Sequence, residues 1–158
     1  MNLLKNKKKF ALIFFCVVIV WGVTVYGDKL FLKKQPKALV EINSAQFKVE
    51  IAQTSSTRYQ GLSDRQELAK NSGMLFIFED YQVRNFIMRN MNFPLDIVRI
   101  KDNLVIHCSK NMPILAQNGN FSRITSKSAV NHVLELNAGI CEEFNIQPGD
   151  SVDIQYLK

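Results

Sequence analysis

Apolar and polar residues alternate along much of this chain, and residues 73–100 show the pattern most densely. Three runs rich in β-branched and aromatic residues, 73–78, 83–88 and 95–100, are separated there by polar connections. Runs of this composition, bounded by polar turn residues, are typical of short β-strands. We therefore expect three strands in this stretch, with Glu79 and Asp80 ending the first of them.

The same signals predict five further strands, at residues 39–42, 47–51, 104–106, 130–136 and 151–157. Two short helices are expected, one between the N-cap Thr54 and Gly61, and one at 138–144 after Asn137. Residues 111–128 are polar and predicted to be irregular. About eight short strands with only two short helices indicate an all-β domain, a single antiparallel sandwich or barrel.

The N-terminal segment has a different pattern, because residues 10–27 form an 18-residue run without a charge after the basic tail 1–9. A helix that spans a membrane needs about 20 mostly apolar residues, whereas the apolar part of a cleaved signal has about 7–15. The run therefore predicts a transmembrane signal anchor, with a cleaved signal peptide as the alternative. A charged linker, 28–38, would join the anchor to the β-rich domain, 39–158.

The lysines around this segment also predict its orientation. Four lysines precede the apolar run, and cytoplasmic flanks carry an excess of positive charge. We expect the N-terminus inside and the β-rich domain on the extracytoplasmic side, bound to the membrane through residues 10–27. If the segment is cleaved instead, the domain would be secreted or periplasmic.

The charge of the folded part argues against nucleic acid as a partner. The whole chain has a net charge of +6, but four of its 20 basic residues lie before Asp28. From Asp28 onward, 16 basic residues face 14 acidic ones, a net of +2. A nucleic-acid-binding domain is expected to concentrate basic charge on its folded surface.

Cysteine and histidine spacing gives no sign of a metal or cofactor. The two histidines, His107 and His132, are isolated, and no pair of cysteines has the spacing of a zinc site. Cys108 ends a predicted strand and Cys141 lies in a predicted helix, and nothing in the pattern brings them within the distance that a disulfide needs. We therefore predict two free thiols.

Several short motifs follow one another in a recognisable order, and they are listed here: Gly61-Leu62, Arg65, Gly73-Met74-Leu75-Phe76, Phe86-x-Met88, Asn90, Pro94-Leu95-Asp96, Val133-Leu134-Glu135-Leu136, Ala138-Gly139 and Gly149-Asp150. This order resembles the bacterial and archaeal family called Domain of Unknown Function 192, over residues 47–154. The resemblance implies a compact all-β domain of jelly-roll or barrel type, in proteins that are often exported. It brings no established catalytic residue, cofactor or substrate. The chain departs from the family at residues 108–128, where relatives often carry a proline-rich segment.

The motifs contain four candidate binding residues and no candidate catalytic group: Arg65, Met88, Asn90 and Asp96. Asp96 alternates with the apolar Val98 and Ile100, so its carboxylate should enter the core and accept hydrogen bonds. The donors we expect are backbone N–H groups of residues 89–93, the Asn90 amide or the Arg65 guanidinium. Met88 should pack in the core or line an apolar cleft.

Two functions are compatible with these residues. Glu135 alternates with Leu134 and Leu136 and is expected to face solvent, so Asp96 lacks the second acid or base that hydrolysis requires. We therefore expect a non-catalytic module that binds a ligand or a protein, neither of which the sequence names. The alternative is a small hydrolase for an envelope or carbohydrate-like substrate.

Overall fold

The fold is seen in a computed structural model that describes residues 35–158, of which Gln35–Lys158 form one compact unit. The expectations for the basic tail, the anchor and most of the linker fall on residues 1–34 and lie outside the described residues. Between residues 35 and 158, no helix is both long and apolar enough to cross a membrane.

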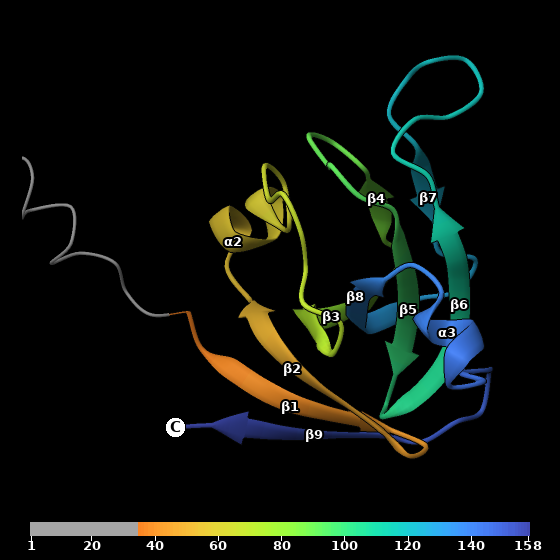
Figure 1. The fold of residues 1–158 in the computed structure, drawn as a ribbon. Coiled ribbons are helices and arrows are strands. Elements are labelled where there is room, and N and C mark those ends of the chain that lie inside the picture. The colour runs from red at the N-terminus through yellow and green to blue at the C-terminus, as the bar shows by residue number, and fades with distance from the viewer. Residues whose placement is uncertain (1–34) are drawn as a thin grey trace, which may run out of the picture. The chain divides into compact units, whose positions relative to one another are not determined.

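Most of the unit is one seven-stranded sheet, shown in Figure 1. From one edge to the other the strands lie in the order β6, β5, β8, β3, β2, β1, β9. A separate two-stranded sheet pairs β4 with β7. The strands are β1 (Lys37–Ile42), β2 (Ala45–Ala52), β3 (Ser72–Gln82), β4 (Asn85–Ile87), β5 (Leu95–Lys101), β6 (Leu104–Met112), β7 (Arg123–Thr125), β8 (Val130–Asn137) and β9 (Val152–Leu157).

The β-rich class and all eight predicted strands are confirmed, but the purely antiparallel sheet is wrong in one place. Strands β2 and β3 pair in parallel, with Val49 opposite Gly73 and Ala52 opposite Phe76. A parallel pair needs a long crossover, and the connection 53–71 supplies it with the helix α2 (Ser55–Gln60). This crossover matters for the site, because α2 lies over one face of the sheet.

Several strand boundaries also differ from the prediction, and β6 continues to Met112 instead of ending at Ile106. Glu79 and Asp80 do not end β3, which continues to Gln82. The predicted irregular segment 111–128 contains the strand β7, which pairs with β4 through Phe86 opposite Ile124. Polar side chains are tolerated in β4 and β7 because both strands are largely exposed to solvent.

The sheet curls so that its two edges meet at one end. Leu104, at the start of β6, forms a bridge with Ser151, which precedes β9. Backbone bonds from Val105 N to Asp150 O and from Val152 N to Asn103 O, both 2.9 Å or shorter, hold this junction. The curled sheet therefore encloses one of its own faces.

Hydrophobic cores lie on both faces of the central strands. The enclosed face carries a cluster that includes Phe47, Leu75 and Leu134, and the opposite face carries Met74, Phe76 and Ile97. Strand β5 is buried at six consecutive positions, whereas β1 alternates between buried and partly exposed. Central strands with both faces covered lose the alternation that outer strands keep.

The predicted helix boundaries hold for one helix and shift for the other. In α2, Thr54 is the N-cap, its side chain accepts a bond from Thr57 N, and Gly61 is the C-cap. The second helix, α3 (Ile140–Glu143), begins after Gly139 and not after Asn137. Gly139 has a positive φ and no side chain, so α3 has no side-chain cap of its own.

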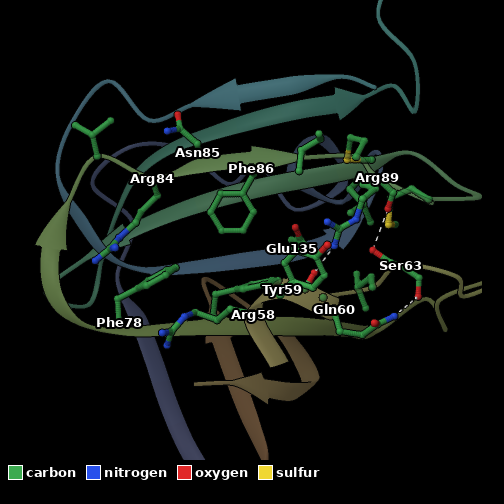
Figure 2. A pocket seen from close by; sticks show the side chains of 18 residues that line it. Arg58, Tyr59, Gln60, Ser63, Phe78, Arg84, Asn85, Phe86, Arg89 and Glu135 are labelled. Carbon is green, nitrogen blue, oxygen red and sulfur yellow. Dashed lines mark hydrogen bonds between the residues drawn. The ribbon is translucent and has the colours of Figure 1, made fainter. Parts of the chain in front are cut away.

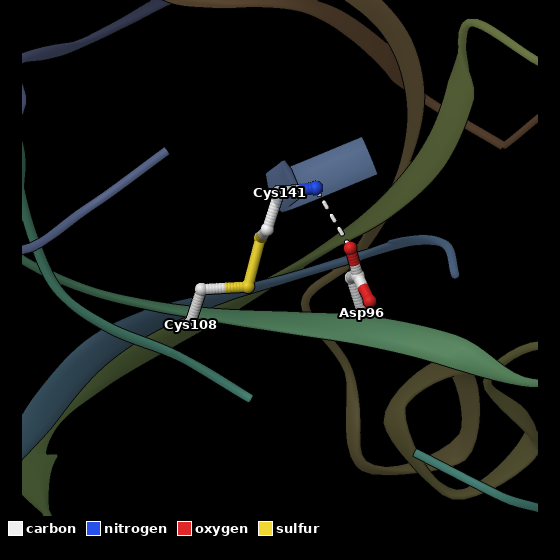
Figure 3. A group of neighbouring side chains, drawn as sticks. All are labelled: Asp96, Cys108 and Cys141. Carbon is white, nitrogen blue, oxygen red and sulfur yellow. Dashed lines mark hydrogen bonds between the residues drawn. A yellow bond between two sulfur atoms is a disulfide. The ribbon is translucent and has the colours of Figure 1, made fainter. Parts of the chain in front are cut away.

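Asp96 supplies the side-chain hydrogen bond to the first turn of α3 that Gly139 cannot provide. Its carboxylate is completely buried and accepts a bond from Cys141 N, in the first turn of α3, at 2.7 Å (Figure 3). It accepts a second bond from Asn111 N, also at 2.7 Å. The expected burial of Asp96 is confirmed, but the predicted donors are wrong. The motif order could not show that α3 and β6 both reach this strand.

Cys108 and Cys141 form a disulfide, so the prediction of two free thiols is wrong. Their Cα atoms are 6.7 Å apart because Asp96 holds Cys141 against β5, and β6, which carries Cys108, pairs with β5 (Figure 3). Val98 and Cys108 pair within the β5–β6 hairpin, but the bond from Cys141 N to Asp96 joins residues 45 positions apart. Local spacing cannot reveal contacts of this kind.

Candidate functional site

A cavity of about 440 Å³ opens on the face of the sheet opposite the enclosed one. It lies between α2 with its following turn, the middle of β3, the strand β4 with its flanking connections, and Leu95 and Glu135 of the sheet. Figure 2 shows the side chains that converge on it. A volume of this order suits a small organic molecule, for which pockets of roughly 300–1,000 Å³ are usual.

The walls of the cavity are largely apolar, and their apolar residues, except Val83 and Ile87, also belong to the core on this face of the sheet. The rings of Phe76 and Phe86 meet edge to face, with centroids 5.1 Å apart. The remaining apolar lining comes from Leu62, Phe78, Val83, Ile87, Met88, Met91 and Leu95. Packing fixes most of this surface before any ligand arrives.

Three arginines line the cavity, and each guanidinium lies over an aromatic ring. Arg84 lies 3.8 Å from the centroid of Phe78, and Arg58 lies 5.1 Å from the same ring. Arg84 forms an ion pair with Asp80, while Arg58 donates from Nη1 to the carbonyl oxygens of Gln53 and Ile77. Of these two side chains, only Arg84 has a carboxylate partner within residues 35–158.

Arg89 comes from the connection after β4 and is held beside α2. Its guanidinium lies 3.9 Å from the centroid of Tyr59 and donates from Nη2 to the Tyr59 carbonyl at 2.6 Å. The Ser63 hydroxyl donates to the Arg89 carbonyl at 2.9 Å, which ties the connection to the turn after α2. In the described part of the chain Arg89 has no acidic partner, so its charge is not balanced.

Glu135 of β8 is the acidic residue of the cavity lining. The expectation that its side chain faces solvent is wrong, because the residue is only 7% exposed. Burial raises the pKa of its carboxyl from 4.5 to about 8, and no neighbouring charge or hydrogen bond in the described region offsets this effect. At neutral pH the carboxyl is mostly protonated, because burial disfavours the charged form.

These groups give the cavity a definite chemistry. Apolar walls favour a ligand with an apolar body, the guanidinium groups favour negative charge, and a neutral carboxyl can both donate and accept a hydrogen bond. Glu135 is the sole carboxyl group among the residues that line the cavity, and none of these residues is a histidine. The lining therefore does not supply the second acid or base that hydrolysis would require beside Glu135. The arrangement can bind and orient a molecule without a catalytic pair.

The four binding residues predicted from the sequence do not lie together in the structure. Only Met88 lines the cavity. Arg65 forms a two-armed ion pair with Glu50, at 2.7 and 2.8 Å, and this pair lowers the pKa of the Glu50 carboxyl and raises that of the Arg65 guanidinium. Asn90 takes a positive φ in an exposed turn, where its carbonyl accepts a bond from Asp64 N. Asp96 points to the enclosed face and holds α3.

Asp96 also belongs to the closest grouping of metal-ligand residue types between residues 35 and 158. Its carboxylate and the sulfurs of Cys108 and Cys141 lie within 4.8 Å of one another (Figure 3). The two sulfurs are bonded to each other, and both carboxylate oxygens accept backbone bonds. This grouping therefore joins α3 to the sheet and offers no free ligand atoms for a metal.

Sequence reasoning missed the principal residues of the cavity. A signal for Glu135 was present, because alternation puts it on the same face as Val133, an apolar and buried residue. The arginines gave no signal of their own, since they lie in different connections and meet only when α2 crosses the sheet. Such convergence depends on the parallel pairing of β2 and β3.

Fold and cavity together define a small β-rich domain with a preformed pocket on one face of a curled mixed sheet. The chain belongs to the family DUF192, Uncharacterized ACR, whose model matches residues 38–154. The match confirms the resemblance drawn from the ordered motifs and covers nearly all of the described unit.

Two solved structures are similar to this chain. One is a protein of unknown function from Novosphingobium aromaticivorans DSM 12444, with 28% identity and a TM-score of 0.68, covering 78% of this chain and 89% of its own. The other, from Sinorhizobium meliloti 1021 and described provisionally as a transcription regulator, has 31% identity and a TM-score of 0.66, covering 76% of this chain and 93% of its own. No curated protein matches the chain.

Proposed function

We propose that this protein is a membrane-tethered, non-catalytic module that binds a small ligand in the cavity beneath α2, on the extracytoplasmic side. The observation that carries the binding role is Glu135, a residue only 7% exposed, whose carboxyl lines a cavity with largely apolar walls and has no ion-pair partner among residues 35–158. A carboxyl in such a setting is costly, and proteins retain such groups where a ligand completes them.

The tether is proposed from the sequence. The uncharged run at 10–27 after a lysine-rich tail supports an anchor, with the domain outside. The disulfide between Cys108 and Cys141 is compatible with this location, because disulfides persist in oxidising compartments.

The binding role is tested by thermal unfolding of the full chain in lipid nanodiscs with a panel of metabolites. A ligand that binds only the folded state raises Tm, by an amount that grows with its concentration. We expect at least one small molecule to do so, and a panel without any effective compound would contradict the proposal.

Two matched variants locate the binding. Val83→Trp places a large ring at an exposed position of the cavity lining, and Leu115→Trp places the same ring at an equally exposed position outside it. The first should abolish the rise in Tm and the second should preserve it. If neither variant changes the rise, the ligand binds somewhere other than the cavity.

A further inference from the structure

We propose that the ligand of this cavity is a small organic anion with an apolar body, whose charged head pairs with Arg89 and which accepts a hydrogen bond from Glu135. The inference rests on the proposed binding function and names the chemical class that the cavity selects. It follows from the balance of charge in the lining, the burial of Glu135 and the apolar walls.

The side chains that line the cavity carry unbalanced positive charge. The lining holds three guanidinium groups, of which Arg84 is neutralised by Asp80. Arg58 and Arg89 have no carboxylate partner among residues 35–158, and Glu135 is mostly uncharged at neutral pH. The cavity is therefore positive, and an anion would balance it.

Arg89 is the better placed of the two unbalanced arginines. Arg58 already uses Nη1 for two carbonyl oxygens, those of Gln53 and Ile77. Arg89 is bound through Nη2 alone, and its stacking on Tyr59 fixes the plane of the guanidinium. A fixed guanidinium with free N–H groups matches the two oxygens of a carboxylate or phosphate.

The apolar walls of the cavity indicate that the rest of the ligand is apolar. A bare inorganic anion would leave the exposed apolar lining, Val83 and Ile87, in contact with water, whereas an apolar body covers it. Within that apolar setting the protonated Glu135 is a hydrogen-bond donor, so the body should carry an acceptor oxygen, or the head itself should reach the carboxyl.

The same groups make binding depend on pH. The charged or titratable groups of the lining are Arg58 and Tyr59 of α2, and Arg84 and Arg89 of the connections around β4. The neighbouring strands present apolar side chains to the cavity, Phe76 of β3 and Leu95 of β5. Arg99 of β5 lies on the same face of the sheet as Glu135, and its buried guanidinium donates to the Ser109 hydroxyl. Loss of the Glu135 proton removes the donor and adds a negative charge that repels an anion, so affinity should fall as pH rises through the Glu135 pKa of about 8.

The test uses three probes with one phenyl ring and different charge: phenylacetate, phenylacetamide and 2-phenylethylamine. Each is titrated by calorimetry into the full chain in nanodiscs at pH ~6, with empty nanodiscs as the blank. We expect phenylacetate to bind at least about tenfold more tightly than the amide or the amine. Equal binding of carboxylate and amide would overturn the anion class while leaving the binding function in place.

Variants assign the roles of the two residues. Arg89→Met should remove the preference for phenylacetate over phenylacetamide, whereas Arg123→Met, which deletes an exposed arginine outside the cavity, should keep it. Circular dichroism and Tm establish that each variant is folded. A preference that survives in folded Arg89→Met would overturn the assignment of the head.

Glu135→Gln tests the second contact. Its amide retains a donor but does not ionise, so the variant should bind phenylacetate equally at pH ~6 and pH ~9, while the wild type weakens by up to about tenfold over the same range. A variant that keeps the wild-type pH dependence would overturn the role of Glu135. Failure of all three probes to bind the wild type would overturn the anion class. The binding function itself would be contradicted only if the metabolite panel also had no effect.

Discussion

Two buried carboxyl groups on opposite faces of the sheet have opposite roles. Asp96 accepts two backbone hydrogen bonds and connects β5 to α3 and β6. Glu135 has no partner in the described region and faces a cavity. The difference in their surroundings separates a residue that stabilises the fold from one that is available to a ligand.

Replacing Asp96 should destabilise the domain. Asp96→Ala leaves the N–H groups of Cys141 and Asn111 buried without an acceptor, which should cost about 1–3 kcal/mol. Urea unfolding of a chain that starts at Asp28 measures this cost, with Asp153→Ala, at an exposed position, as the control. An unchanged midpoint at the same m-value would show that Asp96 does not hold the scaffold.

Glu135 should make stability depend on pH in the opposite sense from an ordinary carboxylate. Its pKa is raised from 4.5 to about 8 in the folded state, so the folded chain keeps a proton that the unfolded chain releases between these values. The free energy of unfolding should therefore fall as pH rises through this window.

Glu135→Gln removes that effect. At pH ~7 the variant should be more stable than the wild type by roughly 1–3 kcal/mol, and the difference should vanish near pH ~4, where both side chains are neutral. Urea unfolding at the two pH values measures it, with the exposed Glu67→Gln as the control. A difference that does not change with pH would contradict the raised pKa.

At the scale of elements, sequence patterns located the strands well and their pairing less well. Alternation in β1 and β2 and the capping signals of α2 are local, so they could be read directly. The parallel pair β2–β3 and the disulfide depend on contacts between distant segments. The cavity depends on the same contacts, which is why only Met88 of the predicted site residues lines it.

The contact between β3 and β8 is close enough to require glycine at position 73. A Cβ built there would lie 2.5 Å from the Glu135 carbonyl and 2.9 Å from Leu136 Cδ2. Gly73→Ala should cost roughly 1–3 kcal/mol through this overlap. A urea midpoint of Gly73→Ala that equals the wild-type midpoint would contradict this explanation.

The disulfide joins α3 to β6 across 33 residues of sequence. Constraint of a loop of this length in the unfolded chain should stabilise the fold by about 3–4 kcal/mol. Thiol counting on the denatured, unreduced full chain should find only Cys16 free, and three free thiols would show that the pair is not formed in the isolated protein. Reduction before unfolding should lower the urea midpoint.

For the whole molecule, the central expectation is a tether that is apolar and not electrostatic. The full chain should stay with membranes in high salt and carbonate, and a chain that starts at Asp28 should be soluble and folded. Cell fractionation with mass measurement decides this. Full-mass protein in the soluble fraction would contradict the anchor, while soluble protein at the mass of residues 28–158 would indicate a cleaved signal.

The most direct test of the binding cavity uses methionine methyl groups as reporters. Met88 and Met91 line the cavity, whereas Met74 and Met112 belong to the same core but not to the lining. The measurement is methyl NMR of the methionine-labelled full chain in nanodiscs, with a compound that raises Tm added to saturation. We predict that the Met88 and Met91 signals shift most. Saturation that leaves both signals in place while Met112 or no methionine responds would contradict the cavity as the binding site.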